Sequence, residues 1–216
     1  MDIARARDFM VESQVRTADV TDTRIIAAMR ALPRERFVPA NKRALAYADL
    51  EVEAAPGRYL MRPRDLAKLV HALSPQPNER ALEIAGATGY GAALLAACCT
   101  EVISLDPDPN LSFAARAALE SAGVANAKTV STAAADGWAD EAPYDVILLN
   151  GAAEFVPDAW LKQLAPGGRL GVIVRQGPAG TARIYTRSED ATAYRAAFDA
   201  APPVAPGLAR EPGFRF

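Results

Sequence analysis

The chain has 216 residues, of which 50% are apolar and 23% are charged, and its formal net charge is −2 at pH 7. This length and composition suit one large domain, or a domain with an extension, and exclude a disordered chain. The charge balance does not suggest a phosphate-backbone binder, and no stretch reaches the ~18 consecutive apolar residues of a membrane span, so we expect neither a nucleic-acid partner nor a membrane span.

The first part of the chain has a helical pattern. Apolar residues recur at three-to-four spacing over residues 2–31, and Thr21-Asp22 is typical of an N-cap for a second helix that ends at Pro33. A further helical turn or two is expected over 41–48. An irregular stretch is expected over 49–63, with a turn at Pro56-Gly57.

Pro63 is expected to open a helix that runs to Leu73, since proline is favoured at a first helical position. From residue 81 the pattern alternates between strand and helix, which indicates a doubly wound, mostly parallel α/β sheet. Runs at 184–186 and 194–198 are expected to pair as an antiparallel C-terminal edge, followed by a Pro-rich extension over 202–212. The predicted strands are 81–85, 102–106, 128–131, 145–150 and 169–175, and the predicted helices are 89–99, 109–122 and 157–164. We therefore expect an N-terminal helical extension over 1–78 and a sheet-containing domain with its tail over 79–216.

The most informative segment runs from Ala81 to Tyr90. An apolar run carries Glu83, passes through small residues and resumes as a helix-like segment, which is the outline of a strand, a tight turn and a helix start. Small residues let a ligand approach the backbone, and the N–H groups of the helix start face it. Asp106 ends the next apolar run, about 20 residues beyond the turn, where an acid can accept hydrogen bonds from ribose hydroxyls. Together these features predict a nucleoside cofactor.

The turn also has other interpretations. A dinucleotide-binding turn has three spaced glycines, whereas this turn has Gly86 and Gly89, with alanine at positions 85 and 87. An ordinary strand–turn–helix connection in an α/β protein has the same outline. A nicotinamide dehydrogenase is a weaker possibility.

Cys98 and Cys99 are adjacent in an apolar stretch, so we expect core thiols rather than a disulfide framework or a metal site. The start of the sequence lacks the apolar segment of a signal peptide. We expect a cytoplasmic protein.

Taken together, these segments resemble the protein-L-isoaspartate O-methyltransferase family over roughly residues 5–175. The segment Pro33–Pro39 is distinctive for that family among S-adenosylmethionine-dependent methyltransferases. Further matching segments are Met10-Val11, Gln14-Val15-Arg16, Ala28-Met29-Arg30, Leu45-Ala46-Tyr47, Leu82-Glu83-Ile84, Thr88-Gly89-Tyr90, Asp136-Gly137-Trp138, Tyr144–Ile147 and Leu164–Leu170.

The resemblance implies a Rossmann-like fold, S-adenosyl-L-methionine as cofactor, and methylation of the free carboxylate of an isoaspartyl residue in a protein or peptide, which is a repair reaction. It implies that the cofactor contacts Glu83 and the turn of Ala85, Gly86, Ala87 and Gly89 through its methionine part. Asp106, followed by Pro107, would hold the ribose, and Asp136 and Gly137 would lie beside the adenine. Asn150, Met61 and Arg62 are the predicted residues of the methyl-transfer centre, and no metal ligand is predicted.

The chain departs from the family pattern at its centre. Met61 stands where the family has a serine, Arg64 stands where many members have a histidine, and Ala85 and Ala87 replace glycines. A pair of arginines, Arg62 and Arg64, suits a planar anion. These departures leave two alternatives open: a family member that has lost catalysis and acts as a binding module, and a methyltransferase for a different acceptor.

Overall fold

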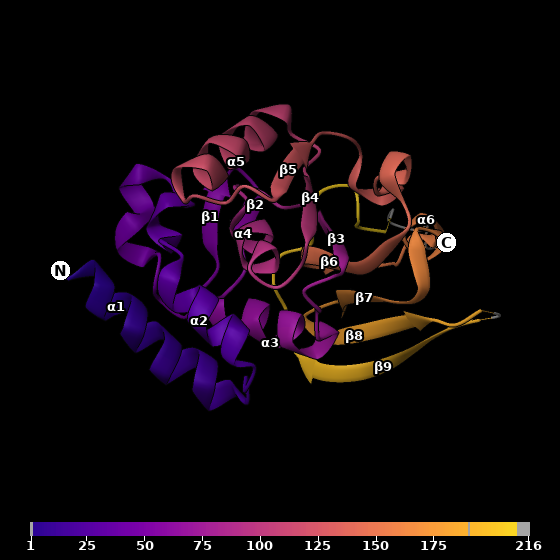
Figure 1. The fold of residues 1–216 in the computed structure, drawn as a ribbon, viewed down its shortest axis with the longest axis horizontal. Coiled ribbons are helices and arrows are strands. Elements are labelled where there is room, and N and C mark those ends of the chain that lie inside the picture. The colour runs from indigo at the N-terminus through magenta and orange to yellow at the C-terminus, as the bar shows by residue number, and fades with distance from the viewer. Residues whose placement is uncertain (1, 190, 211–216) are drawn as a thin grey trace, which may run out of the picture.

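A computed structural model of the chain describes residues 2–189 and 191–210. Its centre is a seven-stranded sheet with the strand order β5-β4-β3-β6-β7-β8-β9 (Figure 1). The strands are β3 (Arg80–Ile84), β4 (Glu101–Leu105), β5 (Ala127–Val130), β6 (Tyr144–Ala153), β7 (Leu164–Gln176), β8 (Ala179–Arg187) and β9 (Thr192–Asp199).

The directions of the strands confirm the predicted fold class. The pairs β3–β4, β4–β5, β3–β6 and β6–β7 are parallel, whereas β8 runs antiparallel to both β7 and β9. The strand order reverses between β3 and β6, since the chain builds outward from β3 to β5 on one side and returns to β6 on the other. Open α/β sheets bind ligands beyond the carboxyl ends of the strands at such a reversal.

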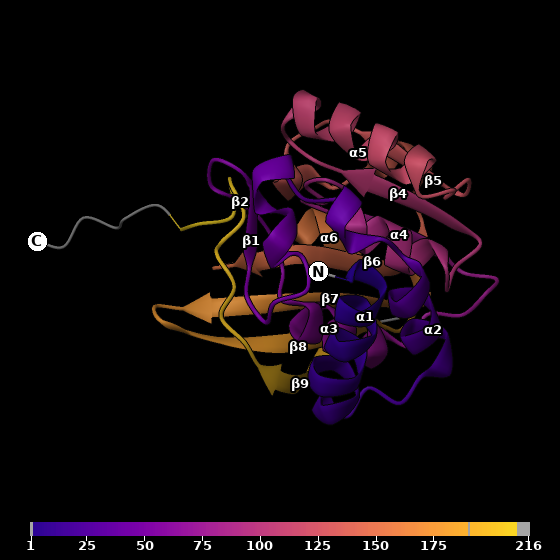
Figure 2. The same ribbon diagram turned by 90° about the vertical axis from the view of Figure 1, so that its left-hand side faces the viewer.

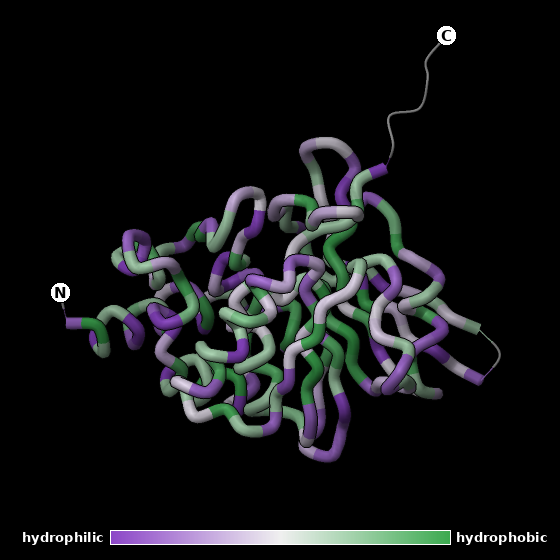
Figure 3. Tube along the Cα trace, turned by 90° about the horizontal axis from the view of Figure 1, so that it is seen from above, coloured by the Kyte–Doolittle hydropathy of each residue, from purple (hydrophilic) through white to green (hydrophobic). Residues whose placement is uncertain are grey.

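Two apolar clusters cover the two faces of the sheet. Val146 and Leu148 belong to the cluster that also contains side chains of the N-terminal helices, and Ile147 and Leu149 belong to the other. This alternation, buried on both sides, explains the continuous apolar run of β6. In Figure 3 the hydrophobic segments gather in the central strands. Because residues before and after position 78 share the first cluster, the predicted boundary there is not a gap in the core; the division into domains stays a prediction.

The helices begin and end near the predicted positions. Asp2 caps α1 (Ile3–Met10), and Asp22 caps α2 (Thr23–Ala31) by accepting from the Arg24 amide at 2.8 Å. A π-helical turn (Val11–Val15) continues α1, and a 3₁₀ segment (Ala40–Leu45) forms the expected turn after Pro39. The remaining helices are α3 (Pro63–Leu73), α4 (Tyr90–Ala96), α5 (Pro109–Ser121) and α6 (Asp158–Lys162).

The stretch predicted to be irregular, 49–63, instead contains a hairpin. β1 (Val52–Ala55) and β2 (Arg58–Leu60) pair antiparallel around the turn at Pro56-Gly57, where Gly57 has φ +69°. Figure 2 shows this hairpin at the edge of the sheet toward which the arrowheads of β6 and β7 point, close to the last described segment of the chain. The hairpin therefore lies at the carboxyl ends of the parallel strands.

The antiparallel C-terminal edge is confirmed, in strands longer than predicted. The predicted extension over 202–212 is described as far as residue 210, and its Val204 forms a bridge with Ala152 of β6. Residues 211 and 212 lie outside the described residues. The segment Pro166-Gly167-Gly168 interrupts the ladder between β6 and β7, because Tyr144 pairs with Leu164 and Val146 already pairs with Arg169.

Candidate functional site

The turn between β3 and α4 has the backbone of a glycine-rich loop. Ala85 and Ala87 have φ +58° and +50°, and Gly89 has φ +87°. An alanine in this left-handed region costs about 1–2 kcal/mol, because its Cβ crowds the following carbonyl. The Gly86 amide donates to the Leu105 carbonyl at 3.0 Å, which fixes the turn to the end of β4. The chain thus keeps a conformation that favours glycine while carrying alanine.

Glu83 lies beneath this turn. Its side chain is fully buried, and Oε2 accepts from the Ser104 hydroxyl at 2.7 Å. A Cβ on Gly86 would approach Oε2 to 2.5 Å, and one on Gly91 would approach Oε1 to 2.0 Å, so both glycines are needed for the carboxyl to fit. Burial raises the pKa of Glu83 to about 8. The predicted contact of Glu83 with a ligand stays a prediction.

Asp106 lies directly beyond β4 and points toward the turn. Its Oδ2 accepts from the Ala87 amide at 2.8 Å, and its Oδ1 accepts from the Asp108 amide at 3.0 Å. Burial raises the pKa of Asp106 above its ordinary value, against the opposing effect of the neighbouring Arg58 guanidinium and the two amides. The predicted proximity of the acid and the turn is therefore present.

Sequence reasoning missed the third partner of Asp106. The Arg58 guanidinium forms a buried ion pair with Oδ2 of Asp106. Arg58 and Leu60 are the two buried residues of β2, and Tyr59 between them is half-buried. The alternation is one of burial, because successive residues of a strand face opposite sides, and the charged Arg58 at a buried position kept it out of the apolar pattern of the sequence.

Asn150 is the polar residue of β6 nearest the site. Its side chain is 4% exposed, and neither its amide nitrogen nor its oxygen has a hydrogen-bond partner in residues 2–189 and 191–210. The expectation that Asn150 ends its strand is wrong, because β6 continues to Ala153. Asn150 instead falls where the pairing with β7 shifts register, between Leu148 and Ala152. A buried amide without partners is costly unless water or a ligand satisfies it.

Met61 and the two neighbouring arginines connect β2 to α3. Met61 is 1% exposed and belongs to the apolar cluster of the N-terminal helices. Arg62 pairs with Glu51 at 2.9 Å, and Arg64 pairs with Asp49 at 3.2 Å. Acids of the chain itself therefore already neutralise the two arginines of the predicted anion clamp.

The residues predicted to lie near an adenine have mixed surroundings. Asp136 ends a short 3₁₀ turn (Ala134–Asp136) and is exposed, and Pro107 is half-buried. Gly137 has φ +64°, and a Cβ there would meet Gln163 at 2.5 Å. The contacts of these residues with a ligand stay predictions.

A buried arginine joins the N-terminal extension to the turn. Arg34 is fully buried, donates to the Ala46 carbonyl at 2.8 Å and to the Met61 carbonyl at 2.7 Å, and lies 4.5 Å over the ring of Tyr90 at the start of α4. The Thr88 hydroxyl donates to the Phe37 carbonyl. The segment Pro33–Pro39, which is distinctive for the family, thus packs against the turn between β3 and α4.

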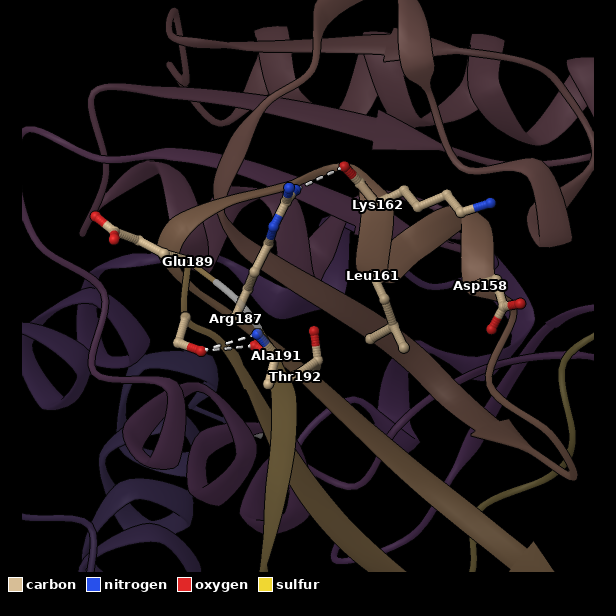
Figure 4. Close-up of a pocket in the computed structure, with 8 residues that line it drawn as sticks. Asp158, Leu161, Lys162, Arg187, Glu189, Ala191 and Thr192 are labelled. Atoms are coloured by element: carbon tan, nitrogen blue, oxygen red, sulfur yellow. Dashed lines mark hydrogen bonds between the residues drawn. The ribbon is translucent and has the colours of Figure 1, made fainter.

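A hollow of about 370 Å³ lies elsewhere on the molecule (Figure 4). It is formed by α6 and the end of β8, where the Arg187 guanidinium donates to the Lys162 carbonyl at 2.9 Å. Thr186 pairs with Arg169 near the start of β7, so this hollow is at the amino end of that strand, opposite the edge that carries Asp106. It is therefore separate from the candidate site.

The model of the family described as protein-L-isoaspartate(D-aspartate) O-methyltransferase matches residues 5–199. The chain belongs to this family. A protein-L-isoaspartate O-methyltransferase of Methanoculleus marisnigri is 37% identical over 166 residues, which are 77% of this chain and 76% of the relative. One of Methylorubrum populi is 38% identical over 179 residues, 83% of this chain and 82% of the relative.

Solved structures of the family share the fold. One protein-L-isoaspartate O-methyltransferase has a TM-score of 0.82 at 24% identity, covering 94% of this chain and 67% of its own. A Plasmodium falciparum protein described as a putative member, in complex with S-adenosyl-L-homocysteine, has a TM-score of 0.78 at 16% identity and covers 92% and 97%. At these identities the likeness establishes the fold. In the described part of this chain, no helix has the length and apolar character to cross a membrane.

Proposed function

We propose that this chain is an S-adenosylmethionine-dependent methyltransferase that methylates the free carboxylate of isoaspartyl residues in proteins or peptides. Its family membership supports the proposal, as do relatives named for this activity and a structural neighbour that binds S-adenosyl-L-homocysteine. The structural observation that carries it is the group of buried polar side chains at the carboxyl edge of β3, β4 and β6. Within the described residues, neither polar side-chain atom of Asn150 has a hydrogen-bond partner there.

The residues at this edge fit a nucleoside cofactor in their chemistry. Asp106 offers carboxylate oxygens of the kind that accept from ribose hydroxyls. The turn of Ala85, Gly86 and Ala87 has the backbone of a close-approach loop, and the amide of Asn150 can both donate and accept. These residues would hold the group.

The bound cofactor supplies an electrophilic methyl group. The residues of the chain have less to do, because an isoaspartyl carboxylate is already ionised at pH 7 and needs no general base. Their contribution is to orient the carboxylate and to exclude water from it. Asn150 has a donor for this purpose, whereas Met61 brings a thioether without one.

The direct test is transfer of an isotopically labelled methyl group from S-adenosylmethionine to an isoaspartyl peptide and to the same peptide with normal aspartate. We expect label on the isoaspartyl peptide well above that on the aspartyl control. Equal, background-level label on both would reject isoaspartyl methylation. A cytoplasmic location is part of the proposal, and fractionation of cells that produce the tagged chain tests it.

Met61 favours a second candidate, a methyltransferase for a different acceptor. The thioether stands at the position where the family has a serine, and both neighbouring arginines are paired with acids. Met61→Ser separates the two functions, with Met61→Ala as the control for lost packing. Isoaspartyl turnover that is absent from the parent and from the alanine variant, but present in the serine variant, would favour the second candidate.

A further inference from the structure

Asp106, the proposed ribose-binding acid, is held in a buried ion pair with Arg58. The side chain of Asp106 is 2% exposed and that of Arg58 is 8% exposed. An acid that accepts hydrogen bonds from ribose hydroxyls has to present an oxygen toward the ligand. In this arrangement the guanidinium of Arg58 covers that acid.

The three hydrogen-bond donors to Asp106 differ in how easily they can move away from its carboxylate. The amides of Ala87 and Asp108 belong to the backbone on either side of the site and are fixed by the fold. Arg58 reaches the same carboxylate through a long, flexible side chain. Displacement of this side chain therefore opens the carboxylate without disturbing the turn.

The position of Arg58 in the hairpin favours such displacement. It directly follows Pro56-Gly57, an exposed turn, so a rotated side chain reaches solvent. Within residues 2–189 and 191–210, its Nε has no hydrogen-bond partner, so Asp106 is its main anchor. A buried ion pair also gives up the hydration of both charges, and the guanidinium regains its share once it is exposed.

We propose that Arg58 sets the affinity of this chain for its cofactor, by pairing with Asp106 so that the nucleoside has to displace it from the carboxylate. This inference rests on the proposed function. The apparent dissociation constant is the intrinsic one divided by the fraction of molecules whose site is open. An arginine that closes nine molecules in ten therefore weakens apparent binding about tenfold.

The test is calorimetric titration of S-adenosyl-L-homocysteine into the parent protein and into Arg58→Gln. We expect the variant to bind about tenfold tighter or better, because glutamine is shorter and cannot form the ion pair. Arg58→Lys keeps the charge and places one compact ammonium in the site, and we expect its affinity to lie between the two. It also serves as the readout if thermal unfolding shows that Arg58→Gln is not folded.

Lys42→Gln is the matched control. Lys42 pairs with Glu53 of β1 at 2.7 Å, so this change removes one positive charge and one contact of the same hairpin without touching Asp106. We expect the control to bind like the parent. If it gains as much affinity as Arg58→Gln, the looseness of the hairpin rather than Arg58 sets the affinity, and the inference is wrong.

The remaining outcomes separate the inference from the proposed function. Parent and Arg58 variants that bind equally well, or variants that bind more weakly, would overturn the role of Arg58 and leave the methyltransferase proposal standing. If the parent and both Arg58 variants fail to bind at millimolar ligand, both proposals are wrong.

Discussion

Glu83 of β3 and Ser104 of β4 face each other across the parallel pair, and the serine hydroxyl donates to the glutamate carboxyl at 2.7 Å. The carboxyl is wedged between Gly86 and Gly91 and is fully buried. Glu83 therefore supports the turn from below. Its raised pKa makes this support dependent on pH.

We expect Glu83 to lower the free energy of unfolding as the pH rises. Burial raises its pKa to about 8 in the folded protein, whereas the unfolded chain has the ordinary value near 4.5. Between these values the folded state binds the extra proton, so its stabilisation is fully present below about pH 4.5 and is lost as the pH rises to about 8. The slope is about 1.4 kcal/mol per pH unit. Glu83→Gln should remove this slope, and urea unfolding at pH 5, 6, 7 and 8 measures it.

Glu101→Gln is the control for that series. Glu101 starts the neighbouring strand, and its pKa is lowered by Lys128 and Arg80 rather than raised by burial. The control should therefore keep the downward slope of the parent. Parallel slopes for the parent and Glu83→Gln would contradict the assignment.

Replacement of Ala85 or Ala87, which have positive φ angles, with glycine should raise the stability of the protein. Ala85→Gly and Ala87→Gly each relieve about 1–2 kcal/mol of crowding, and each adds about 0.5–1 kcal/mol of unfolded-state entropy. We expect a net gain of roughly 0.5–1 kcal/mol per change in the free energy of unfolding, from the same two terms. Chemical denaturation measures it.

Ala92→Gly serves as the reference for these reversions. Ala92 is buried inside α4, so glycine there should cost about 1 kcal/mol. A loss of stability in Ala85→Gly or Ala87→Gly as large as in this reference would show that the positive φ angles carry no strain.

Substitution of Asn150 by an apolar residue should raise the stability of the protein and lower its activity. Asn150→Leu keeps the branch at Cγ and the number of side-chain heavy atoms, and it removes two buried polar atoms that lack partners among the described residues, so the free protein should gain about 1–3 kcal/mol. Methyl transfer to the isoaspartyl peptide should fall at least tenfold, because the donor at the proposed reaction centre is gone. Thermal unfolding and turnover are measured on the same sample.

The contrast for Asn150 is Asn126→Leu. The Asn126 amide donates to the carbonyls of Ala96 and Cys99 at 2.9 and 3.1 Å, so its removal should lower stability and spare turnover. If Asn150→Leu behaves like this contrast, Asn150 is a structural residue.

Substitution of Arg34 should cause a large loss of stability. Arg34→Met fills much of the same space but leaves the carbonyls of Ala46 and Met61 without their donor and removes the cation over Tyr90. We expect a loss of about 3 kcal/mol, at 1–3 kcal/mol per unsatisfied buried group. Arg34→Lys keeps the charge but cannot reach both carbonyls with a fixed fork, so it should recover less than half of the loss. A change below about 1 kcal/mol in Arg34→Met would contradict this role, because it is smaller than one buried group left unsatisfied.

The parallel strands and the helix α3 followed from local signals. The continuous apolar run of β6 indicates a strand covered on both faces, and Pro63 fixes a helix start. The hairpin of β1 and β2 was missed because each strand is short, and because Arg58 breaks the apolar alternation that marks a strand. The burial of the Arg58 side chain depends on Asp106, which is 48 residues away along the chain.

The sequence by itself determined the fold class, the family and the placing of an acid near the carboxyl end of each of two neighbouring strands, because periodicity and turn chemistry act over a few residues. The tertiary structure alone decided which groups meet at the site. In the structure, Arg58 forms an ion pair with Asp106, and Arg62 and Arg64 pair with other acids. Asn150 has no hydrogen-bond partner for its side chain among the described residues. These outcomes depend on the desolvation and pairing of charges from distant segments, which no local pattern encodes.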